Sequence, residues 1–303
     1  MVGTEITLET VSESNLAGLV ALSRKVFNKK RSEDYFRQKY LKNTILAQPV
    51  SSVALVKGQE VAFVGAIPQL YKGSDQTHLI AHTCEYQTHP DYRNLQIHSQ
   101  LIDRTNKILR AQGVNMLYAY FSDVSERSVK RLGWNHLRYL HFTVIQTGAI
   151  PIQKAKYKIL GKSGWESFIV GLKQLSEITT NDSTVLEVIN SDLLKYRTFT
   201  DNGIFDFSGC AFWIKLSEVL HIGKFSTENF DSFKSGLTEL IKRCKKFGID
   251  KIVFQTDPDG LEYEFLKRCN YNLEPGALIG THFLNEEFNT DKFEFSYSSF
   301  DNF

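Results

Sequence analysis

One stretch constrains the fold of this chain most, because it joins a predicted strand to a predicted helix through a sharp turn. An apolar and aromatic run over residues 76–88 predicts a β-strand, and residues 97–112 have helical spacing that ends at Gly113. Residues 114–121 predict the next strand. A strand that turns directly into a helix leaves backbone N–H groups free at the positive end of the helix dipole. The turn between them, residues 89–96, is therefore a place where a phosphate could bind.

The composition is that of an ordinary globular protein. The 303 residues suggest two domains or one large one, and 42% hydrophobic residues can bury a sizeable core. The net charge of +2 gives no global case for nucleic acid or for an anionic membrane. Aromatic and basic residues are mixed without forming a nucleic-acid-binding face, so we predict no nucleic-acid partner.

The cysteine pattern predicts free, mostly buried thiols. Cys84, Cys210, Cys244 and Cys269 are far apart and form no C-x-x-C pair. We see no metal-ligand spacing, no G-x-S-x-G, no H-E-x-x-H and no P-loop, so we predict no metal. No signal peptide is visible and no apolar run approaches ~20 residues, which predicts a soluble, cytoplasmic protein.

The rest of the first half alternates strands and helices. A strand at residues 5–9 is predicted, then a helix that Ser12 or Ser14 can cap, then a second helical segment at 32–41. Apolar runs on each side of Lys57-Gly58-Gln59-Glu60 predict a hairpin. A short helix at 125–132 and a strand at 137–146 follow. This order predicts an α/β fold in which helices flank a mixed sheet.

Three segments give this order a family likeness. His89-Pro90-Asp91-Tyr92-Arg93, Lys130-Arg131-Leu132-Gly133-Trp134 and Asp34-Tyr35-Phe36-Arg37-Gln38-Lys39-Tyr40 stand where the GNAT superfamily of N-acetyltransferases has its own motifs. The chain resembles that superfamily, and in particular a longer subgroup linked to polysaccharide and amino-sugar acylation. The resemblance implies transfer of an acyl group from acetyl-CoA or another acyl-CoA to the amine of a small molecule such as an amino sugar.

The resemblance also implies a donor site. The backbone of the strand would polarise the acyl carbonyl, and the turn would hold the coenzyme. By position these residues are Tyr86, Gln87, Thr88, Arg93, Asn94, Leu95, Gln96, Ile97, His98 and Ser99. Gln96 and His98 occupy positions where the family has small residues, because the backbone must approach the pyrophosphate closely. Either these two side chains point away from the ligand, or the turn no longer binds it.

Candidates for the catalytic base come from the same strand. Glu85 is the first, because the family often places a carboxylate there, and His82 is the second. Strand alternation predicts Glu85 on the face opposite Cys84 and Tyr86. The alternative is an ordinary exposed glutamate beside a core histidine.

The usual general acid of the family is absent. Val129 stands where the family has a tyrosine, so Tyr118, Tyr120, Ser125 or water would have to protonate the leaving thiolate. Trp134 and Tyr139 are predicted to pack in the core.

The second half echoes the first in three places, in order. Residues 192–197 echo 34–39, residues 248–253 echo 113–118, and residues 266–271 echo 129–134. Such self-similarity predicts a duplicated unit. We therefore predict tandem GNAT-like domains, with limits 1–147 for the first, 148–183 for a connector and 184–303 for an abbreviated second domain.

The second copy has no phosphate turn. Ser226 or Thr227 is predicted to cap a helix from Glu228 to Phe247, whose acidic first turn would repel phosphate. Residues 293–297 alternate like a closing strand.

The connector has two interpretations. Lys154, Lys156, Lys158 and Lys162 precede Trp165, Phe168 and Leu172, a basic amphipathic pattern that could rest weakly on a membrane surface through residues 154–172. The alternative is a linker helix packed between domains with solvated lysines.

Two functions remain open from the sequence. The first is an acyl-CoA-dependent N-acyltransferase, and the second is a non-catalytic binding or scaffold protein on a degenerate GNAT fold. Gln96, His98 and Val129 are the residues that separate them.

Overall fold

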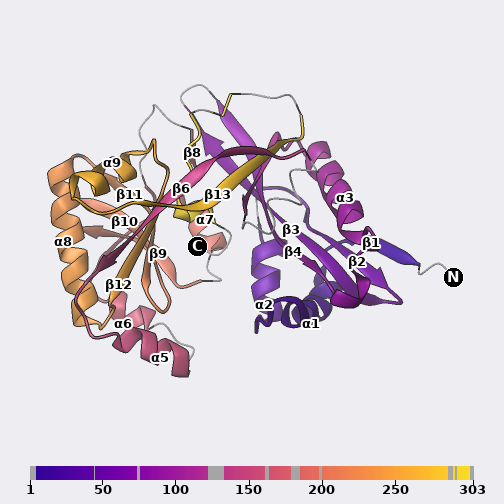
Figure 1. The fold of residues 1–303 in the computed structure, drawn as a ribbon, viewed down its shortest axis with the longest axis horizontal. Helices are drawn as coiled ribbons and strands as arrows, with labels where there is room; N and C mark the ends of the chain where they lie inside the picture. The colour runs from indigo at the N-terminus through magenta and orange to yellow at the C-terminus, as the bar shows by residue number, and fades with distance from the viewer. Residues whose placement is uncertain are drawn as a thin grey trace.

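The computed structural model describes residues 5–43, 45–73, 76–121, 133–160, 164–178, 185–197, 200–285, 289–290 and 292–300. Within these ranges, 13 strands form one mixed sheet that runs through the molecule, and helices flank it (Figure 1). The strand order is β1-β2-β3-β4-β5-β13-β6-β12-β11-β10-β9-β7, with β8 paired to β3. This is the α/β architecture, a mixed sheet flanked by helices, that the sequence predicts.

The strands have the following bounds: β1 Ile6–Thr10, β2 Ser52–Val56, β3 Gln59–Lys72, β4 Thr77–Thr88, β5 Met116–Phe121, β6 Asn135–Gln146, β7 Lys173–Leu175, β8 Leu186–Glu187, β9 Asn202–Phe207, β10 Cys210–Leu216, β11 Leu220–Thr227, β12 Lys251–Thr256 and β13 Glu274–Phe283. The α-helices are α1 Leu16–Phe27, α2 Glu33–Phe36, α3 Ile97–Ala111, α5 Ile152–Leu160, α6 Trp165–Ile169, α7 Ser191–Tyr196, α8 Phe230–Lys246 and α9 Leu261–Arg268. Short 3₁₀ turns lie at Glu13–Asn15, Pro90–Tyr92 and Tyr297–Ser299, and one π-helical turn continues α2 at Arg37–Leu41.

The middle of the sheet has the same arrangement on both sides. β4 and β5 are parallel neighbours connected through α3, and β11 and β12 are parallel neighbours connected through α8. β6 follows β5 in the chain but pairs with β12 of the second half. In the same way, β13 follows β12 but pairs with β5 of the first half. β6 and β13 pair with each other at the centre. Each half of the chain thus completes its sheet with a strand from the other half.

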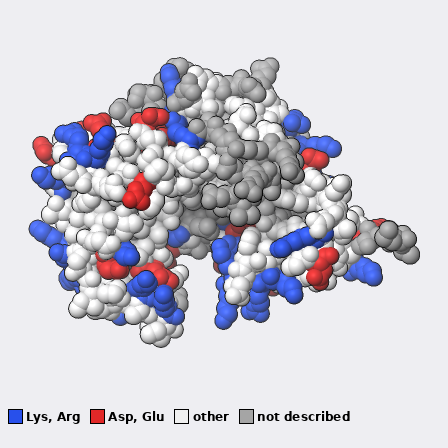
Figure 2. Space-filling model, in the orientation of Figure 1, with Lys and Arg blue, Asp and Glu red and all other residues white. Residues whose placement is uncertain are grey.

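This repeated order is what a tandem pair of units would produce. The limits 1–147, 148–183 and 184–303 stay predictions, and the sheet itself is continuous across them. In the space-filling view the two halves form two lobes with a notch between them (Figure 2).

β3 is buried on both faces because helices lie on each side of it. Phe63 and Ile67 pack in an apolar cluster with α1 and α2, whereas Ala62 and Val64 pack in another cluster with α3. Successive strand residues point to opposite faces, so a strand covered on both sides needs a nearly continuous apolar run. Residues 61–67 supply that run.

The predicted closing strand at residues 293–297 is wrong. Phe293 makes one isolated bridge to Val185, and Tyr297 already begins a 3₁₀ turn. The alternation arises because this extended segment is buried on both sides. Glu294, a polar member of the pattern, is buried in an ion pair with Lys224.

Two further local predictions are wrong. α8 begins at Phe230, and its cap is Asn229, whose Oδ1 accepts a hydrogen bond from the Ser232 N–H at 3.0 Å. Ser226 and Thr227 instead end β11. The Tyr139 side chain is 48% exposed, because β6 turns that face toward solvent.

β13 was not predicted at all. Its sequence contains Pro275 and Gly276 near its start, which lack the apolar alternation of a strand. The register of β13 against β6 is irregular at this point.

The cysteine prediction is confirmed: all four are free, three are buried, and Cys269 is partly exposed. Among the described residues, no helix combines the length and apolar character needed to cross a bilayer.

Candidate functional site

β4 parts from β5 along its length, and this leaves one edge of β4 open. The parallel pairing joins only Ile80–His82 to Met116–Tyr118, whereas β4 continues to Thr88. Within the described residues no strand pairs with this edge beyond that point, so its backbone groups are available to a ligand. The predicted acyl-binding segment, residues 86–88, lies on this open part.

A β-bulge interrupts the same strand at Glu85. This residue has φ of +56°, and β4 has one residue more than β3 between the pairs Gly65–Cys84 and Phe63–Gln87. An extra residue shifts the alternation of the side chains by one. The predicted placement of Glu85 opposite Cys84 is therefore wrong, and both side chains contact the same helical segment.

Gly65 is required opposite the bulge. A Cβ there would lie 2.8 Å from the carbonyl oxygen of Cys84 and 2.7 Å from the Tyr40 hydroxyl. The close approach of the two backbones leaves no room for a side chain.

Two side chains from α2 and the π-helical turn after it, and one from the residue before the α2 cap, hold the Glu85 carboxylate. Lys39 Nζ donates to Oε1 at 2.6 Å, the Tyr35 hydroxyl donates to the same oxygen at 2.7 Å, and Arg31 pairs with Oε2. Lys39 has no exposed surface, and the Glu85 side chain is 5% exposed. Charge-assisted hydrogen bonds of this kind are strong in a buried setting. The cluster fixes the bulge.

Sequence patterns alone assign no catalytic or binding role to Arg31, Tyr35 or Lys39. A signal was present, because Tyr35 and Lys39 are four residues apart in a helical segment and belong to one of the three stretches that carry the family likeness. What the sequence could not show is that both reach across to β4.

Tyr86 and Gln87 point to opposite faces after the bulge. The Tyr86 ring lies 5.1 Å from that of His98 on the α3 side, which directs Gln87 toward the α1 and α2 side. Gln87 is 2% exposed, and neither polar atom of its carboxamide has a hydrogen-bond partner in the described structure. A buried amide without partners is costly, which is typical of a group kept for a ligand.

His82 lies where β4 and β5 part. Its ring stacks on Tyr118 with the centroids 4.8 Å apart and meets Tyr120 edge-on at 5.3 Å. Burial raises the pKa of both tyrosines well above the usual 10. Tyr118 also donates hydrogen bonds to Gln69 and to the Ser299 carbonyl, so neither phenol is an easily released acid.

The turn after β4 has the backbone conformation that the family pattern anticipates. Asn94 and Gln96 have φ of +68° and +58°, values that favour glycine, and α3 begins immediately afterwards at Ile97. No side chain caps this helix end, and its first turn carries no acidic residue. The first N–H groups of α3 are therefore available to an anion.

Arg93 and His98 stand differently at this turn. Arg93 is exposed, and its Nε donates a long hydrogen bond of 3.4 Å to the Thr88 carbonyl. The His98 side chain, in the first turn of α3, packs against the Tyr86 ring. Burial lowers the pKa of His98, which favours the neutral ring. His98 thus contributes packing to the helix start, while Arg93 keeps its charge at the surface.

The corresponding edge in the second half is closed. β11 also parts from β12 after a short parallel pairing, but the Glu262 carboxylate accepts a hydrogen bond from the Phe225 N–H at 2.9 Å. Lys224 and Glu294 pair beside it. Burial raises the pKa of Glu262 to about 7.

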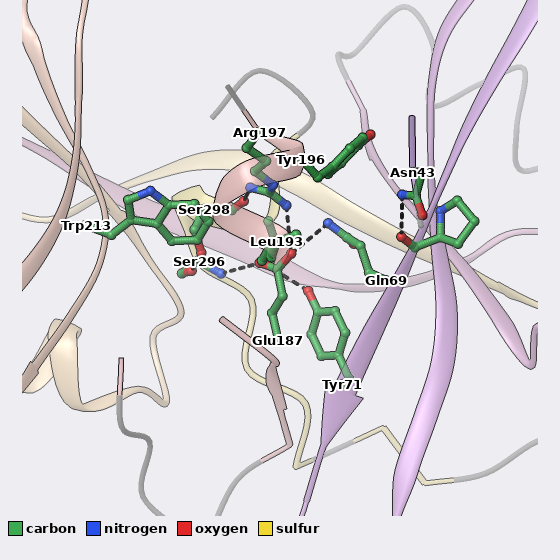
Figure 3. Close-up of polar contacts among 12 residues, drawn as sticks. Asn43, Gln69, Tyr71, Glu187, Leu193, Tyr196, Arg197, Trp213, Ser296 and Ser298 are labelled. Atoms are coloured by element: carbon green, nitrogen blue, oxygen red, sulfur yellow. Dashed lines mark hydrogen bonds and ion pairs between the residues drawn. The ribbon is translucent and has the colours of Figure 1, made fainter. Parts of the chain in front are cut away.

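A buried polar network joins the halves next to β3 (Figure 3). The Gln69 amide donates to Glu187 Oε1 at 2.9 Å, and Arg197 donates to the same oxygen at 2.7 Å. Arg197 also donates to the Ser298 carbonyl. Burial raises the pKa of Glu187, and Arg197 opposes that rise.

This network borders a pocket of about 260 Å³ between the halves. Its walls carry amide groups from both sides and carboxylates from Glu187 and Asp192, and no lysine or arginine is among the described residues that line it. The lining residues are Asn43, Ile45, Gln69, Leu70, Glu187, Val188, Asn190, Asp192, Leu193 and Tyr196.

Some predicted residues lie outside the described ranges. These are Ser125, Val129 and the Lys130–Leu132 part of the second motif. Trp134, its last residue, is buried and meets Phe121 edge-on at 5.3 Å, as predicted. No group of side chains suited to a metal occurs in the part of the chain that the structure describes.

Comparisons with known proteins identify the fold. Residues 7–137 match the family described as "Acetyltransferase (GNAT) domain". Among solved structures, a GCN5-related N-acetyltransferase from Kribbella flavida has a TM-score of 0.61 at 11% identity over 92% of this chain and 71% of its own. A probable N-acyltransferase from Enterococcus faecalis has a TM-score of 0.64 at 14% identity, over 93% and 73% of the two chains.

A third likeness is to the N-myristoyltransferase of Saccharomyces cerevisiae, solved with bound myristoyl-CoA. Its TM-score is 0.57 at 10% identity, over 93% of this chain and 79% of that one. No curated protein matches the sequence. The chain has the GNAT fold. Because these solved structures share only 10–14% of their residues with this chain, they show similarity of fold and not of activity.

Proposed function

We propose that this chain is an acyl-CoA-dependent N-acyltransferase. The observation that carries the proposal is that the open edge of β4 ends at an uncapped helix N-terminus. An extended pantetheine arm can hydrogen-bond to such an edge, and a pyrophosphate can bind at such a helix end. The family match over residues 7–137 points to the same class.

The donor in this proposal binds along one continuous surface. The pyrophosphate binds the backbone N–H groups of the first α3 turn, Ile97–Ser99, beside the charge of Arg93. The thioester lies against residues 86–88, whose backbone N–H groups polarise its carbonyl. The amine attacks that carbonyl, a C–N bond forms, the C–S bond breaks and the thiolate leaves as free coenzyme A.

The acceptor in this proposal is a small molecule with a primary amine, such as an amino sugar. The pocket of about 260 Å³ between the halves supports a small acceptor, because its amide and carboxylate groups suit hydroxyl and ammonium groups. Acetyl-CoA is the first donor to test, and a long-chain acyl-CoA is the second. Coenzyme A thioesters are cytoplasmic substrates, so we keep that location as part of the proposal.

Glu85 and His82 remain the proposed catalytic residues. The Glu85 oxygens already accept from Lys39, Tyr35 and Arg31, so the same carboxylate also fixes the bulge. Glu85→Gln separates the two roles. Loss of the rise in rate at the acidic side of the pH profile indicates a base, whereas a lower rate with an unchanged profile indicates a positioning residue.

Calorimetric titration tests the donor site directly. We expect one acyl-CoA per chain, and we expect Arg93→Ala to raise Kd about tenfold through loss of a charge-assisted contact. Lys107→Ala, which changes an exposed lysine on α3, is the control and should leave Kd unchanged. Absence of heat at millimolar donor would overturn the proposal.

A second candidate, a non-catalytic acyl-CoA-binding protein, rests on the two tyrosines. Tyr118 is buried and Tyr120 half-buried, each donates to a carbonyl of the C-terminal segment, and their raised pKa values suit packing better than proton donation. Donor binding without release of free coenzyme A across a panel of small amines favours this candidate.

A further inference from the structure

Helix α5 exposes apolar side chains and buries the amide side chain of Gln153. Gln153 is 5% exposed, and its Nε2 donates to the Ser217 carbonyl at 2.9 Å. Three apolar side chains of the same helix are exposed: Ile152 by 49%, Ile159 by 80% and Leu160, the last residue of the helix, by 65%. A surface helix normally shows the reverse pattern.

The neighbouring segments extend the same exposed apolar surface. Ile150, just before α5, is 77% exposed, and Val170, just after α6, is 71% exposed. α5 and α6 lie together at one end of the second half (Figure 1), and that end is a largely uncharged tip in the space-filling view (Figure 2). Exposed apolar patches of this kind mark interaction sites.

Lysines flank the apolar stripe of α5. With 100° between successive residues, Ala155 and Ile159 share the outward face, and Lys156 and Lys158 lie on its two sides. Ile152 lies at the docked start of the helix and is half-exposed. Residues 148–160 contain three lysines and no acidic residue. Long lysine side chains can reach outward past such a stripe and keep their charges in the layer of headgroups.

The helix is held rigidly enough to present this face. The backbone N–H of Gln153 donates to the Gly248 carbonyl at 3.0 Å, and a Cβ at Gly248 would lie 2.7 Å from the Cβ of Ile152. The start of α5 therefore sits directly on the α8–β12 turn. The later part of α5, with Ile159 and Leu160, stays exposed.

We propose that the α5–α6 tip, defined by Ile150, Ile152, Ile159, Leu160 and Val170 with Lys156 and Lys158, docks on the surface of an anionic lipid bilayer. The apolar side chains enter the boundary between headgroups and acyl chains, and the lysines pair with anionic headgroups. Charge favours this occupant over a neutral one, since Lys154, Lys156 and Lys158 of α5 outnumber the one acidic residue of α6, Glu166. The docking is independent of acyl transfer and can fail or hold without it.

Vesicle co-sedimentation of the full chain tests the docking. We expect binding to vesicles of phosphatidylcholine with about one-third phosphatidylglycerol, and at least tenfold weaker binding to pure phosphatidylcholine. Each lysine near an anionic surface contributes roughly a factor of five to affinity. Because salt screens this attraction, added salt should release the protein. Equal binding to both vesicles, or none to either, would overturn the proposal.

Two variants and two matched controls locate the surface. Ile159→Gln/Leu160→Gln and Lys156→Glu/Lys158→Glu should each lower vesicle binding more than tenfold. Leu261→Gln on α9 and Lys107→Glu on α3 change exposed side chains elsewhere and should not lower it.

Folding and self-association are the remaining checks. Unchanged circular dichroism and Tm are expected because the altered side chains are exposed. Light scattering should give the same molecular mass for the wild type and all variants. If the wild type is a dimer and only Ile159→Gln/Leu160→Gln is a monomer, a second copy of the chain covers the tip, and the proposal is wrong.

Discussion

The Glu262 carboxylate accepts a hydrogen bond from the Phe225 backbone N–H at 2.9 Å, at the point in the second half where the first half leaves its strand edge open. β11 parts from β12 just as β4 parts from β5. The same architecture therefore carries one open edge and one edge that a side chain occupies. This asymmetry explains why we expect one donor per chain.

Glu262 should make the protein less stable as pH rises. Its pKa is about 7 in the fold against 4.5 as the ordinary value, so the folded state holds the proton more tightly than the unfolded state. The resulting stability is complete below pH 4.5 and is lost as pH rises through about 7. The full loss is on the order of 3 kcal/mol. Urea unfolding at pH 4.5, 6 and 7.5 measures it.

Glu262→Gln should flatten this dependence, because the amide keeps an oxygen for the Phe225 N–H but does not titrate. Asp257, with a pKa raised to about 6, leaves a smaller slope of the same sign. Glu264→Gln, an exposed carboxylate on the same helix, is the control and should keep the wild-type slope. A wild-type slope in Glu262→Gln contradicts the assignment.

Lys39→Met should destabilise the fold strongly. It removes a fully buried cation from Glu85 and leaves the carboxylate short of a partner, which costs about 3–5 kcal/mol. Adding Glu85→Gln to Lys39→Met should recover part of the loss, since the uncompensated charge is gone. Lys42→Met, exposed nearby, should stay within about 0.5 kcal/mol of wild type. An equal loss in the single and double variants would exclude this coupling.

The sequence predicts most of the first half, because its periodicity and turns are local. Residues 76–121 fold as predicted, and positive φ at Gln96 agrees with a position where the family has a small residue. The bulge at Glu85 could not be predicted, because alternation assumes a regular strand. The exchange of β6 and β13 depends on pairing between distant segments, which no local pattern contains.

Gln96→Gly should tighten donor binding. Gln96 has φ of +58°, a conformation that costs a residue with a Cβ about 1–2 kcal/mol, and its side chain stands at the predicted pyrophosphate. Glycine removes both the strain and the side chain, whereas Gln96→Ala removes only the outer side chain. The backbone strain is present before the donor binds and cancels from Kd, so calorimetry should give both variants a Kd below that of wild type, and urea unfolding should show the strain as a higher stability of Gln96→Gly. Kd values equal to that of wild type would place the pyrophosphate elsewhere.

Gln87→Leu should stabilise the protein while lowering its activity. The carboxamide is buried and unpartnered in the described structure, and removing such a group returns roughly 1–3 kcal/mol. Because the same amide faces the α1 and α2 side beside the open edge, its loss should cost at least tenfold in kcat/KM. Unfolding in urea and release of free coenzyme A measure the two effects.

Gln69→Leu makes the same chemical change at an equally buried amide that is fully bonded. Gln69 accepts from Tyr118 and donates to Glu187, so its loss removes one hydrogen bond from each of two buried groups and should destabilise the protein. Opposite signs of the two changes in unfolding free energy are the expected result. If Gln87→Leu instead lowers the free energy of unfolding, the Gln87 amide supports the fold, and the inference that it is kept for a ligand is wrong. The reason is that removing a buried polar group raises the free energy of unfolding only when that group has no partner in the protein.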